Sequence, residues 1–182
     1  MVKKIGLLSR PKILNLFGYT GLASLILASS GAEVTHVDAS KPAITWAREN
    51  QELSGLGHKP IRWIVEDAMK FVERELNRRH QYDGIILDPP EFGRGPKGEV
   101  WRIEESLRDM IGSCVHLLSD RAVFLLLSVY ATDLSPVTLY YLFKDALNNR
   151  EGAVEIGELF SVEAKRKRAI SKSLFVRWYK QV

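Results

Sequence analysis

Residues 13–21 read Ile-Leu-Asn-Leu-Phe-Gly-Tyr-Thr-Gly, an apolar run that breaks into a glycine turn. A second run covers residues 34–37 and ends at Asp38, and a third covers residues 84–87 and ends in Asp88-Pro89-Pro90. A glycine turn after a buried strand, with a carboxylate closing the next strand about 20 residues later, is the arrangement that binds the ribose of a nucleoside cofactor. The three strand ends therefore predict one ligand site at one edge of a sheet.

Strand-like and helix-like segments alternate along the chain, which is typical of a parallel sheet covered by helices on both faces. The last two strands are close enough in sequence to pair as an antiparallel hairpin. We therefore predict an α/β fold with a doubly wound, Rossmann-like sheet that is mostly parallel, in a single domain covering residues 1–182. The expected strands are 13–17, 33–37, 61–65, 82–87, 122–129, 153–161 and 173–180, and the expected helices are 20–30, 41–53, 68–79, 100–118 and 135–148.

Residues 91–98 follow the third carboxylate and contain three glycines and a proline. This composition predicts a loop. Its position after a strand end makes it the best candidate for a mobile lid over the ligand site.

Composition excludes several classes of protein. The chain has 182 residues, 46% of them hydrophobic, and a formal net charge of +4, which favours an anionic partner without requiring one. The only cysteine, Cys114, cannot form an internal disulfide, and no signal-peptide pattern opens the chain, so we expect a cytoplasmic protein. The longest apolar stretch, residues 122–127, is too short to span a bilayer, and the four histidines lack metal-ligand spacing, so we expect neither a membrane nor a metal partner.

The carboxylates expected at the sheet edge point to a particular cofactor. Asp38, Asp67 and Asp88 would repel one another, so their pocket should receive a ligand that offers hydroxyl and amine donors. S-adenosyl-L-methionine has both: ribose hydroxyls for Asp38 and an ammonium group for the glycine turn. A pyrophosphate needs Gly-x-Gly-x-x-Gly, whereas this turn reads Gly18-Tyr19-Thr20-Gly21, and the bulky Tyr19 at its second position disfavours a dinucleotide. The alternatives are a plain strand-to-helix turn and a helix-capping role for Asp38.

Asp88-Pro89-Pro90 indicates an acceptor site. Two prolines remove two backbone donors and force the chain off the sheet, so we expect their carbonyls to point outward as unpaired acceptors. A carboxylate with outward carbonyls can hold the amino group or ring edge of a nucleobase, and Phe92 could stack on that base. The alternative is a rigid proline turn with a solvated aspartate.

These segments together resemble a known family, the class I S-adenosylmethionine-dependent methyltransferases related to the bacterial large-subunit ribosomal RNA cytosine-C5 methyltransferases. The resemblance runs from about residue 12 to the end of the chain. The segments that carry it are Leu14-Asn15-Leu16-Phe17-Gly18-Tyr19-Thr20-Gly21, Val37-Asp38-Ala39-Ser40, Glu66-Asp67-Ala68, Leu87-Asp88-Pro89-Pro90-Glu91-Phe92-Gly93 and Ser173-Leu174-Phe175-Val176-Arg177-Trp178.

The resemblance implies a methyltransferase fold, S-adenosylmethionine as cofactor, ribosomal RNA as partner, and a role for each predicted site residue. The implied cofactor residues are Phe17, Gly18, Tyr19, Thr20 and Gly21 for the methionine part, Asp38 for the ribose with Ala39 and Ser40 beside it, and Asp67 and Ala68 for the adenine. The implied acceptor residues are Asp88, Pro89, Pro90 and Phe92, with Asp88 also bordering the cofactor.

Two departures from the family pattern limit this expectation. Cytosine-C5 transfer needs a cysteine thiolate, which the family carries just after the fifth strand, where this chain reads Ser128-Val129-Tyr130. The helical spacing of Cys114 from Met110 makes it a core residue instead, so we expect a ring or exocyclic nitrogen as acceptor. In addition, only 12 residues precede the first strand, so we expect the family's N-terminal region to be absent.

Basic residues cluster near the end of the chain, at residues 165–168 and Lys172, and within the expected lid at Arg94 and Lys97. They could contact RNA phosphates, or they could simply be solvated.

Two other functions share parts of the pattern. A nicotinamide-dependent oxidoreductase would need the glycine triplet, and a non-catalytic nucleoside-binding module would keep Asp38 without needing Asp88.

Overall fold

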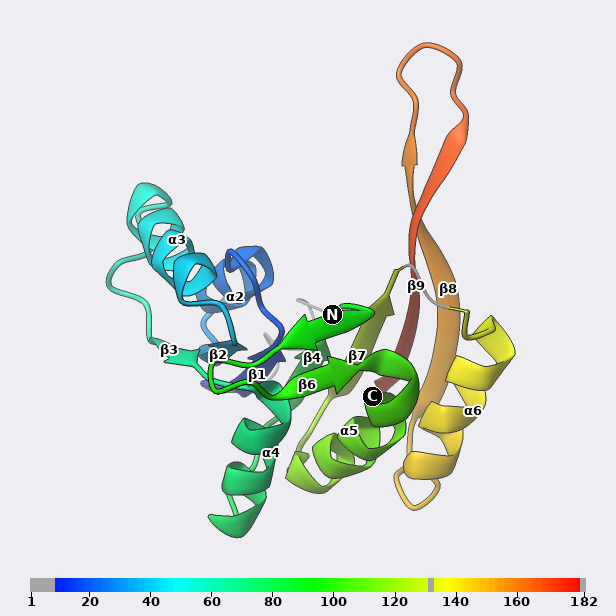
Figure 1. The fold of residues 1–182 in the computed structure, drawn as a ribbon, viewed down its shortest axis with the longest axis horizontal. Helices are drawn as coiled ribbons and strands as arrows, with labels where there is room; N and C mark the ends of the chain where they lie inside the picture. The colour runs from blue at the N-terminus through cyan, green and yellow to red at the C-terminus, as the bar shows by residue number, and fades with distance from the viewer. Residues whose placement is uncertain (1–8, 131–132, 181–182) are drawn as a thin grey trace.

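A computed structural model describes residues 9–130 and 133–180. Its main sheet has seven strands in the order β3-β2-β1-β4-β7-β9-β8, and the strand order reverses between β1 and β4 (Figure 1). The first five strands of this order run parallel, and β9 runs antiparallel to β7 and to β8. The predicted fold class is confirmed. The strands are β1 (Lys12–Leu16), β2 (Glu33–Asp38), β3 (Ile61–Val65), β4 (Gly84–Leu87), β7 (Phe124–Val129), β8 (Ala153–Val162) and β9 (Ala169–Tyr179).

Helices cover the sheet on two sides. Three of them pack on one face around the larger core, which includes Phe71, Met110 and Phe143. The other two lie on the opposite face, as Figure 1 shows, where Leu27 and Ala28 contribute to a smaller apolar cluster. Helices on the first face are α4 (Ala68–Asn77), α5 (Ile103–Leu117) and α6 (Pro136–Ala146), and those on the second are α2 (Leu22–Ser29) and α3 (Lys41–Leu53). In the described part of the chain, no helix is long and apolar enough to cross a membrane.

Local signals in the sequence mark the start of α3 and the ends of α2 and α3, and α3 has its expected bounds, whereas the other helices are shorter than the expected 20–30, 68–79, 100–118 and 135–148. The Ser40 hydroxyl accepts a hydrogen bond from the Ala43 N–H and caps the start of α3. Gly31 and Gly55 follow α2 and α3 with φ of 93° and 68°, which is the left-handed conformation that a helix end favours.

The segment expected as a loop is instead a small hairpin. Within residues 91–98, Phe92–Arg94 forms β5, which pairs with β6 (Val100–Arg102), so α5 begins at Ile103 rather than at residue 100. Gly95, Pro96 and Gly98 occupy the turn, Gly93 lies in β5, and buried Trp101 holds β6 against the body of the protein. Composition alone missed this pairing because tertiary packing of one aromatic side chain stabilises it.

The β8–β9 hairpin is longer than expected, since β9 begins at Ala169 rather than at residue 173. Its outer part extends beyond the main sheet, away from α4, α5 and α6 (Figure 1). The strand expected at 82–87 begins at Gly84, because Tyr82 makes only an isolated bridge to Leu118.

Candidate functional site

The carboxyl ends of β1, β2 and β4 meet at one edge of the sheet, and a cavity of about 220 Å³ lies there. Most of its wall comes from predicted site residues, and the rest comes from the β5–β6 hairpin. It is lined by Phe17, Asp38, Ala39, Ser40, Asp67, Ala68, Pro90, Gly93, Arg94, Gly95 and Trp101. The other predicted residues, Gly18, Tyr19, Thr20, Gly21, Asp88, Pro89 and Phe92, do not line this cavity.

Asp38 is held in a fixed orientation. Its Oδ2 accepts a hydrogen bond from the Tyr19 N–H and its Oδ1 accepts one from the Ser40 N–H, both at 2.8 Å. A carboxylate has about four acceptor positions, so each oxygen can still accept a hydroxyl. Asp38 is therefore suited to hold the two hydroxyls of a ribose.

The turn from Phe17 to Gly21 has an unusual backbone. Phe17, Tyr19 and Gly21 have φ of 57°, 49° and 90°, and the first two lack the freedom of glycine. Each such non-glycine residue costs about 1–2 kcal/mol, and strained positions of this kind gather at ligand sites. The strain supports a binding role for this turn over a plain connection.

The same turn has few donors left for a phosphate. The Gly18 N–H bonds the Val37 carbonyl at 3.1 Å, the Gly21 N–H bonds the Gly18 carbonyl at 3.1 Å, and the Tyr19 N–H is used by Asp38. A pyrophosphate would need several free N–H groups at this position. The geometry favours a nucleoside cofactor over a dinucleotide.

Buried polar residues that the sequence analysis missed support the turn from below. Asn15 Nδ2 donates to Ser24 Oγ at 2.9 Å, and Ser24 Oγ lies 2.9 Å from Nδ1 of His36. His36 is fully buried and packs against Trp63 with the two rings tilted by 59°, and burial lowers the pKa of His36 to about 4, so the ring is neutral. The sequence shows Asn15 and His36 only as polar residues within two apolar strands, and the structure shows that they pair.

Gly18 lies directly on the His36 ring. A Cβ at residue 18 would stand 2.3 Å from His36 Cε1 and 2.9 Å from Asn15 Nδ2. Glycine is therefore required at residue 18 by this close approach. The His36 ring fixes how closely the backbone of the turn can pack.

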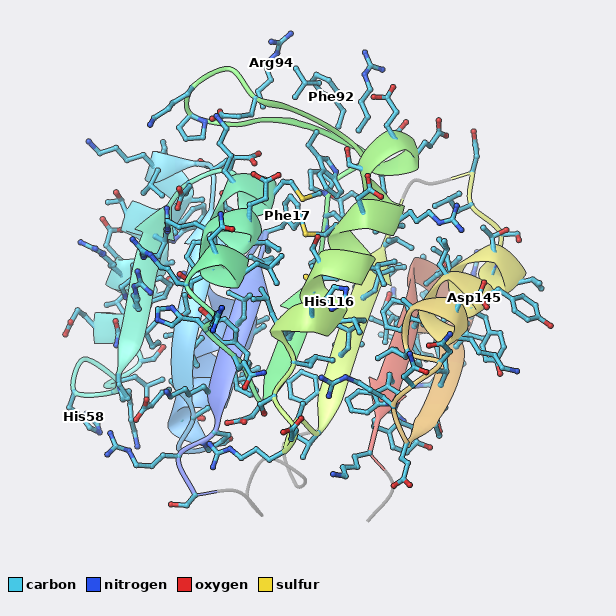
Figure 2. The ribbon with its side chains drawn as sticks, turned by 90° about the horizontal axis from the view of Figure 1, so that it is seen from below. Phe17, His58, Phe92, Arg94, His116 and Asp145 are labelled. Atoms are coloured by element: carbon cyan, nitrogen blue, oxygen red, sulfur yellow. The ribbon has the colours of Figure 1, made fainter. Side chains whose placement is uncertain are left out.

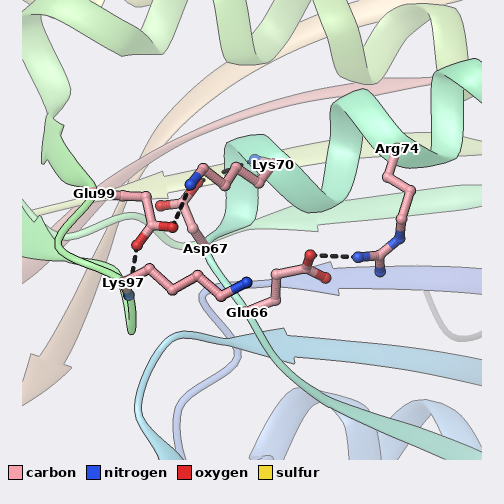
Figure 3. A network of polar contacts seen from close by, with 6 residues as sticks. All are labelled: Glu66, Asp67, Lys70, Arg74, Lys97 and Glu99. Carbon is pink, nitrogen blue, oxygen red and sulfur yellow. Dashed lines mark hydrogen bonds and ion pairs between the residues drawn. The ribbon is translucent and has the colours of Figure 1, made fainter.

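Asp67 has a structural task as well as a place in the cavity wall. Its Oδ1 accepts a hydrogen bond from the Lys70 N–H at 3.0 Å and caps α4. Figure 3 shows the surrounding network, in which Lys70 binds Glu99 and Glu99 also accepts from the Lys97 N–H. Because Glu99 precedes β6, this ion pair ties the small hairpin to α4, and it lowers the pKa of Glu99 to about 2.

Asp88 stands at the end of β4 with its side chain open to solvent. Neighbouring protein atoms partly desolvate its carboxylate and raise its pKa, and a hydrogen bond with Ser128 opposes that rise. Ser128, at the end of β7, is thus a site residue whose role the sequence did not indicate. It occupies the region where the resembling family carries its cysteine.

The carbonyls of the two prolines are not both free, contrary to expectation. The Pro90 carbonyl accepts a hydrogen bond from Trp101 Nε1 at 2.7 Å, and Trp101 also contacts the ring of Phe17 with centroids 4.9 Å apart. The cause is the unexpected hairpin, which brings Trp101 over the proline turn. Trp101 therefore links the proline turn to the turn that begins at Phe17.

Phe92 lies on the outer side of this hairpin, where Figure 2 shows it beside Arg94 at the edge of the molecule. The guanidinium groups of Arg94 and Arg102 lie 5.8 and 5.6 Å from the centre of its ring. Phe92 is half exposed, so an aromatic surface with two cations borders the site.

Cys114 lies in the core, as expected. It is fully buried in α5, and burial raises the pKa of its thiol. Among the described residues, no group of three His, Cys, Asp or Glu side chains could hold a metal ion.

Comparisons with known proteins find similarity to methyltransferases. No family model matches the chain. It is 37% identical over 109 residues to "Ribosomal RNA large subunit methyltransferase K/L" of Shewanella frigidimarina, a match that covers 59% of this chain and 15% of that protein.

Solved structures match over nearly the whole chain. The S-adenosylmethionine-dependent methyltransferase of Agrobacterium tumefaciens is 48% identical with a TM-score of 0.95, covering 99% of this chain and 59% of that one. The magnesium protoporphyrin IX methyltransferase of Synechocystis, solved with bound S-adenosylmethionine, shares the fold at 17% identity with a TM-score of 0.64, covering 99% of this chain and 74% of that one. The chain therefore spans only part of the first two proteins.

Proposed function

This chain is related to the S-adenosylmethionine-dependent methyltransferases, and we propose that it transfers a methyl group from S-adenosylmethionine to a base nitrogen of ribosomal RNA. The observation that carries the proposal is the cavity that joins Asp38, Asp67 and Pro90 at the reversal point of the sheet. The similarity to a large-subunit ribosomal RNA methyltransferase supports RNA as acceptor, and such an acceptor implies a cytoplasmic enzyme.

The cavity residues fit this cofactor. Asp38 would accept hydrogen bonds from the ribose hydroxyls, because its oxygens are oriented by two N–H donors and retain free lone pairs. Ala68 and Phe17 offer apolar wall to the adenine and methionine parts, and the bound cofactor supplies a methyl group on a sulfonium, which is a good leaving group.

The acceptor would lie at the proline turn. Asp88 accepts a hydrogen bond from the amino group of the base, orients its nitrogen, and can take the proton that an exocyclic amine loses after methylation. Its raised pKa suits this task, since a carboxylate with a higher pKa is a stronger base. Most of the rate then comes from holding nitrogen, methyl carbon and sulfur in line, an effect worth several kcal/mol. Phe92, with Arg94 beside it, can stack on the flanking nucleotide.

Transfer of labelled methyl to protein-free bacterial large-subunit ribosomal RNA, followed by nucleoside analysis, tests the proposal. We expect one methylated nucleoside, and we expect Asp88→Asn to lower kcat by about 100-fold or more while the Kd of S-adenosylhomocysteine stays within about twofold. Asp145→Asn, on α6 away from the site in Figure 2, is the matched control and should keep full activity. Normal turnover by the Asp88 variant would remove the acceptor assignment, and absence of cofactor binding in the unmodified protein would remove the function.

A further inference from the structure

The outer part of the β8–β9 hairpin is a free two-stranded arm. The last residue of β7, Val129, pairs with Leu174 of β9, and within residues 9–130 and 133–180 no strand pairs on that side with the residues of β9 before Leu174. They pair only with the end of β8, from Leu159 to Val162. Five residues at about 3.3 Å each carry the arm about 16 Å past β7, before its turn is added. Figure 1 shows it extending alone from the rest of the molecule.

The end of the arm is strongly basic. Residues 159–172 contain five cations and one acidic residue, Glu163. The cations are Lys165, Arg166, Lys167, Arg168 and Lys172, all exposed. In the described ranges, 9–130 and 133–180, none of the five forms an ion pair within the protein. Five unneutralised charges on a narrow projection are suited to a polyanion.

Apolar side chains stand next to these cations. Phe160 is 60% exposed and Val162 is 54% exposed, and their alternate positions put them on the same face of β8. An exposed aromatic ring beside cations is the combination on which unpaired bases stack while their phosphates are neutralised.

The arm begins beside the acceptor site. The Ser128 side chain lies close enough to the Asp88 carboxylate to lower its pKa, and its hydroxyl lies 3.3 Å from the hydroxyl of Ser173, the residue of β9 where the arm starts. Since β8 runs in the same direction as β1 and β4, its end emerges at the edge of the sheet that carries Asp88. A polymer with one of its residues bound at Asp88 would therefore run alongside the arm.

We propose that this arm, residues 159–172, is a docking surface for the RNA strand that flanks the target nucleotide. The four cations of the turn neutralise its phosphates, and Phe160 stacks on an unpaired base. The proposal rests on the proposed function, because the flanking strand is defined by a target base at Asp88. A second copy of this chain is a poorer occupant, since two turns of the same charge repel.

Binding and turnover of a charge-neutralised variant test the arm. In the tip variant, Lys165, Arg166, Lys167 and Arg168 are all changed to Ser. The control variant loses the same charge elsewhere, through Arg48, Lys59, Arg108 and Lys144 changed to Ser. The probe is protein-free bacterial large-subunit ribosomal RNA, and Kd is measured over a range of salt concentration, with KM and kcat for methyl transfer.

For the tip variant we expect an RNA Kd and KM raised at least about tenfold and a salt slope reduced by about 3, which corresponds to four lost phosphate contacts. Its kcat at saturating RNA and its Kd for S-adenosylhomocysteine should match those of the control variant. Phe160→Ser should weaken RNA binding without changing the salt slope.

Two results would overturn the arm and leave the proposed function intact: equal RNA affinity and salt slope in the tip and control variants, or a tip variant that changes only the sedimentation of the protein, which would assign the arm to protein contacts. If the unmodified protein binds the cofactor but neither binds nor methylates the RNA, both proposals fail.

Discussion

Gly18 and His36 show how a single contact sets the shape of the turn from Phe17 to Gly21. A Cβ at residue 18 would press into the imidazole, which is fully buried and cannot move aside. We expect Gly18→Ala to lower the free energy of unfolding by about 1–3 kcal/mol, as overpacking does, and to weaken cofactor binding. Gly112→Ala is the control, because residue 112 is helical with open space around it, and this change should stabilise by about 0.5–1 kcal/mol. Denaturant unfolding of both variants gives the comparison.

His36 also makes stability depend on pH. Its pKa is about 4 in the folded protein and about 6.5 when unfolded, so below pH 6.5 the unfolded chain binds more protons. The stabilisation is therefore present above pH 6.5 and decreases as the pH falls towards 4. Between pH 7 and pH 4 the protein should lose about 3 kcal/mol more than the His36→Asn variant, measured by urea unfolding at each pH. Parallel pH profiles for the two proteins would show that His36 is protonated in the fold.

Asp88 should appear in the pH dependence of the reaction. Its pKa is raised by desolvation, and in the proposed function the ionised form is the one that would accept a hydrogen bond from the base. We therefore expect kcat/KM to fall with decreasing pH at a value above the usual aspartate range of about 3.9. The residual activity of Asp88→Asn should lack this acid limb, and a limb that persists in the variant would belong to another group.

At the scale of elements, the β5–β6 hairpin connects the two halves of the site through Trp101. Trp101→Phe keeps the ring but leaves the Pro90 carbonyl without its donor, so we expect a loss of about 1 kcal/mol in stability and a lower kcat. Trp46→Phe, on the exposed side of α3, is the control and should change neither quantity. Thermal unfolding and methyl-transfer kinetics check both. An unchanged kcat for Trp101→Phe would show that the hairpin only covers the site.

The secondary-structure elements also show which features sequence patterns could predict and which they could not. Strand ends such as Asp38 and caps such as Ser40 were predictable, because they depend on neighbours in the chain. The β5–β6 hairpin was not, because Trp101 packs on Phe17, which lies 84 positions earlier in the sequence. Asn15 and His36 were missed for the same reason, since their partners become visible only when two strands are in register.

At the scale of the whole molecule, the arm should be separable from the fold. It contributes no residue to either apolar cluster, so replacing residues 160–172 with Asn-Gly should leave the melting temperature within about 3 °C, which corresponds to about 1 kcal/mol or less. Calorimetry checks this expectation. A large fall in melting temperature would show that the arm stabilises the sheet. The RNA-binding measurements on the tip variant would then be the test of whether the arm docks RNA.

The sequence by itself determined the parallel sheet, its helices and the row of carboxylates at its edge, because strand period, glycine turns and caps are local properties of the chain. Only the tertiary structure decided that Ser128 lies near Asp88, that Trp101 donates a hydrogen bond to the Pro90 carbonyl, and that the basic residues stand on a free arm at the same edge of the sheet. The physical reason is that these features depend on strand order and register, which bring together residues far apart in the chain.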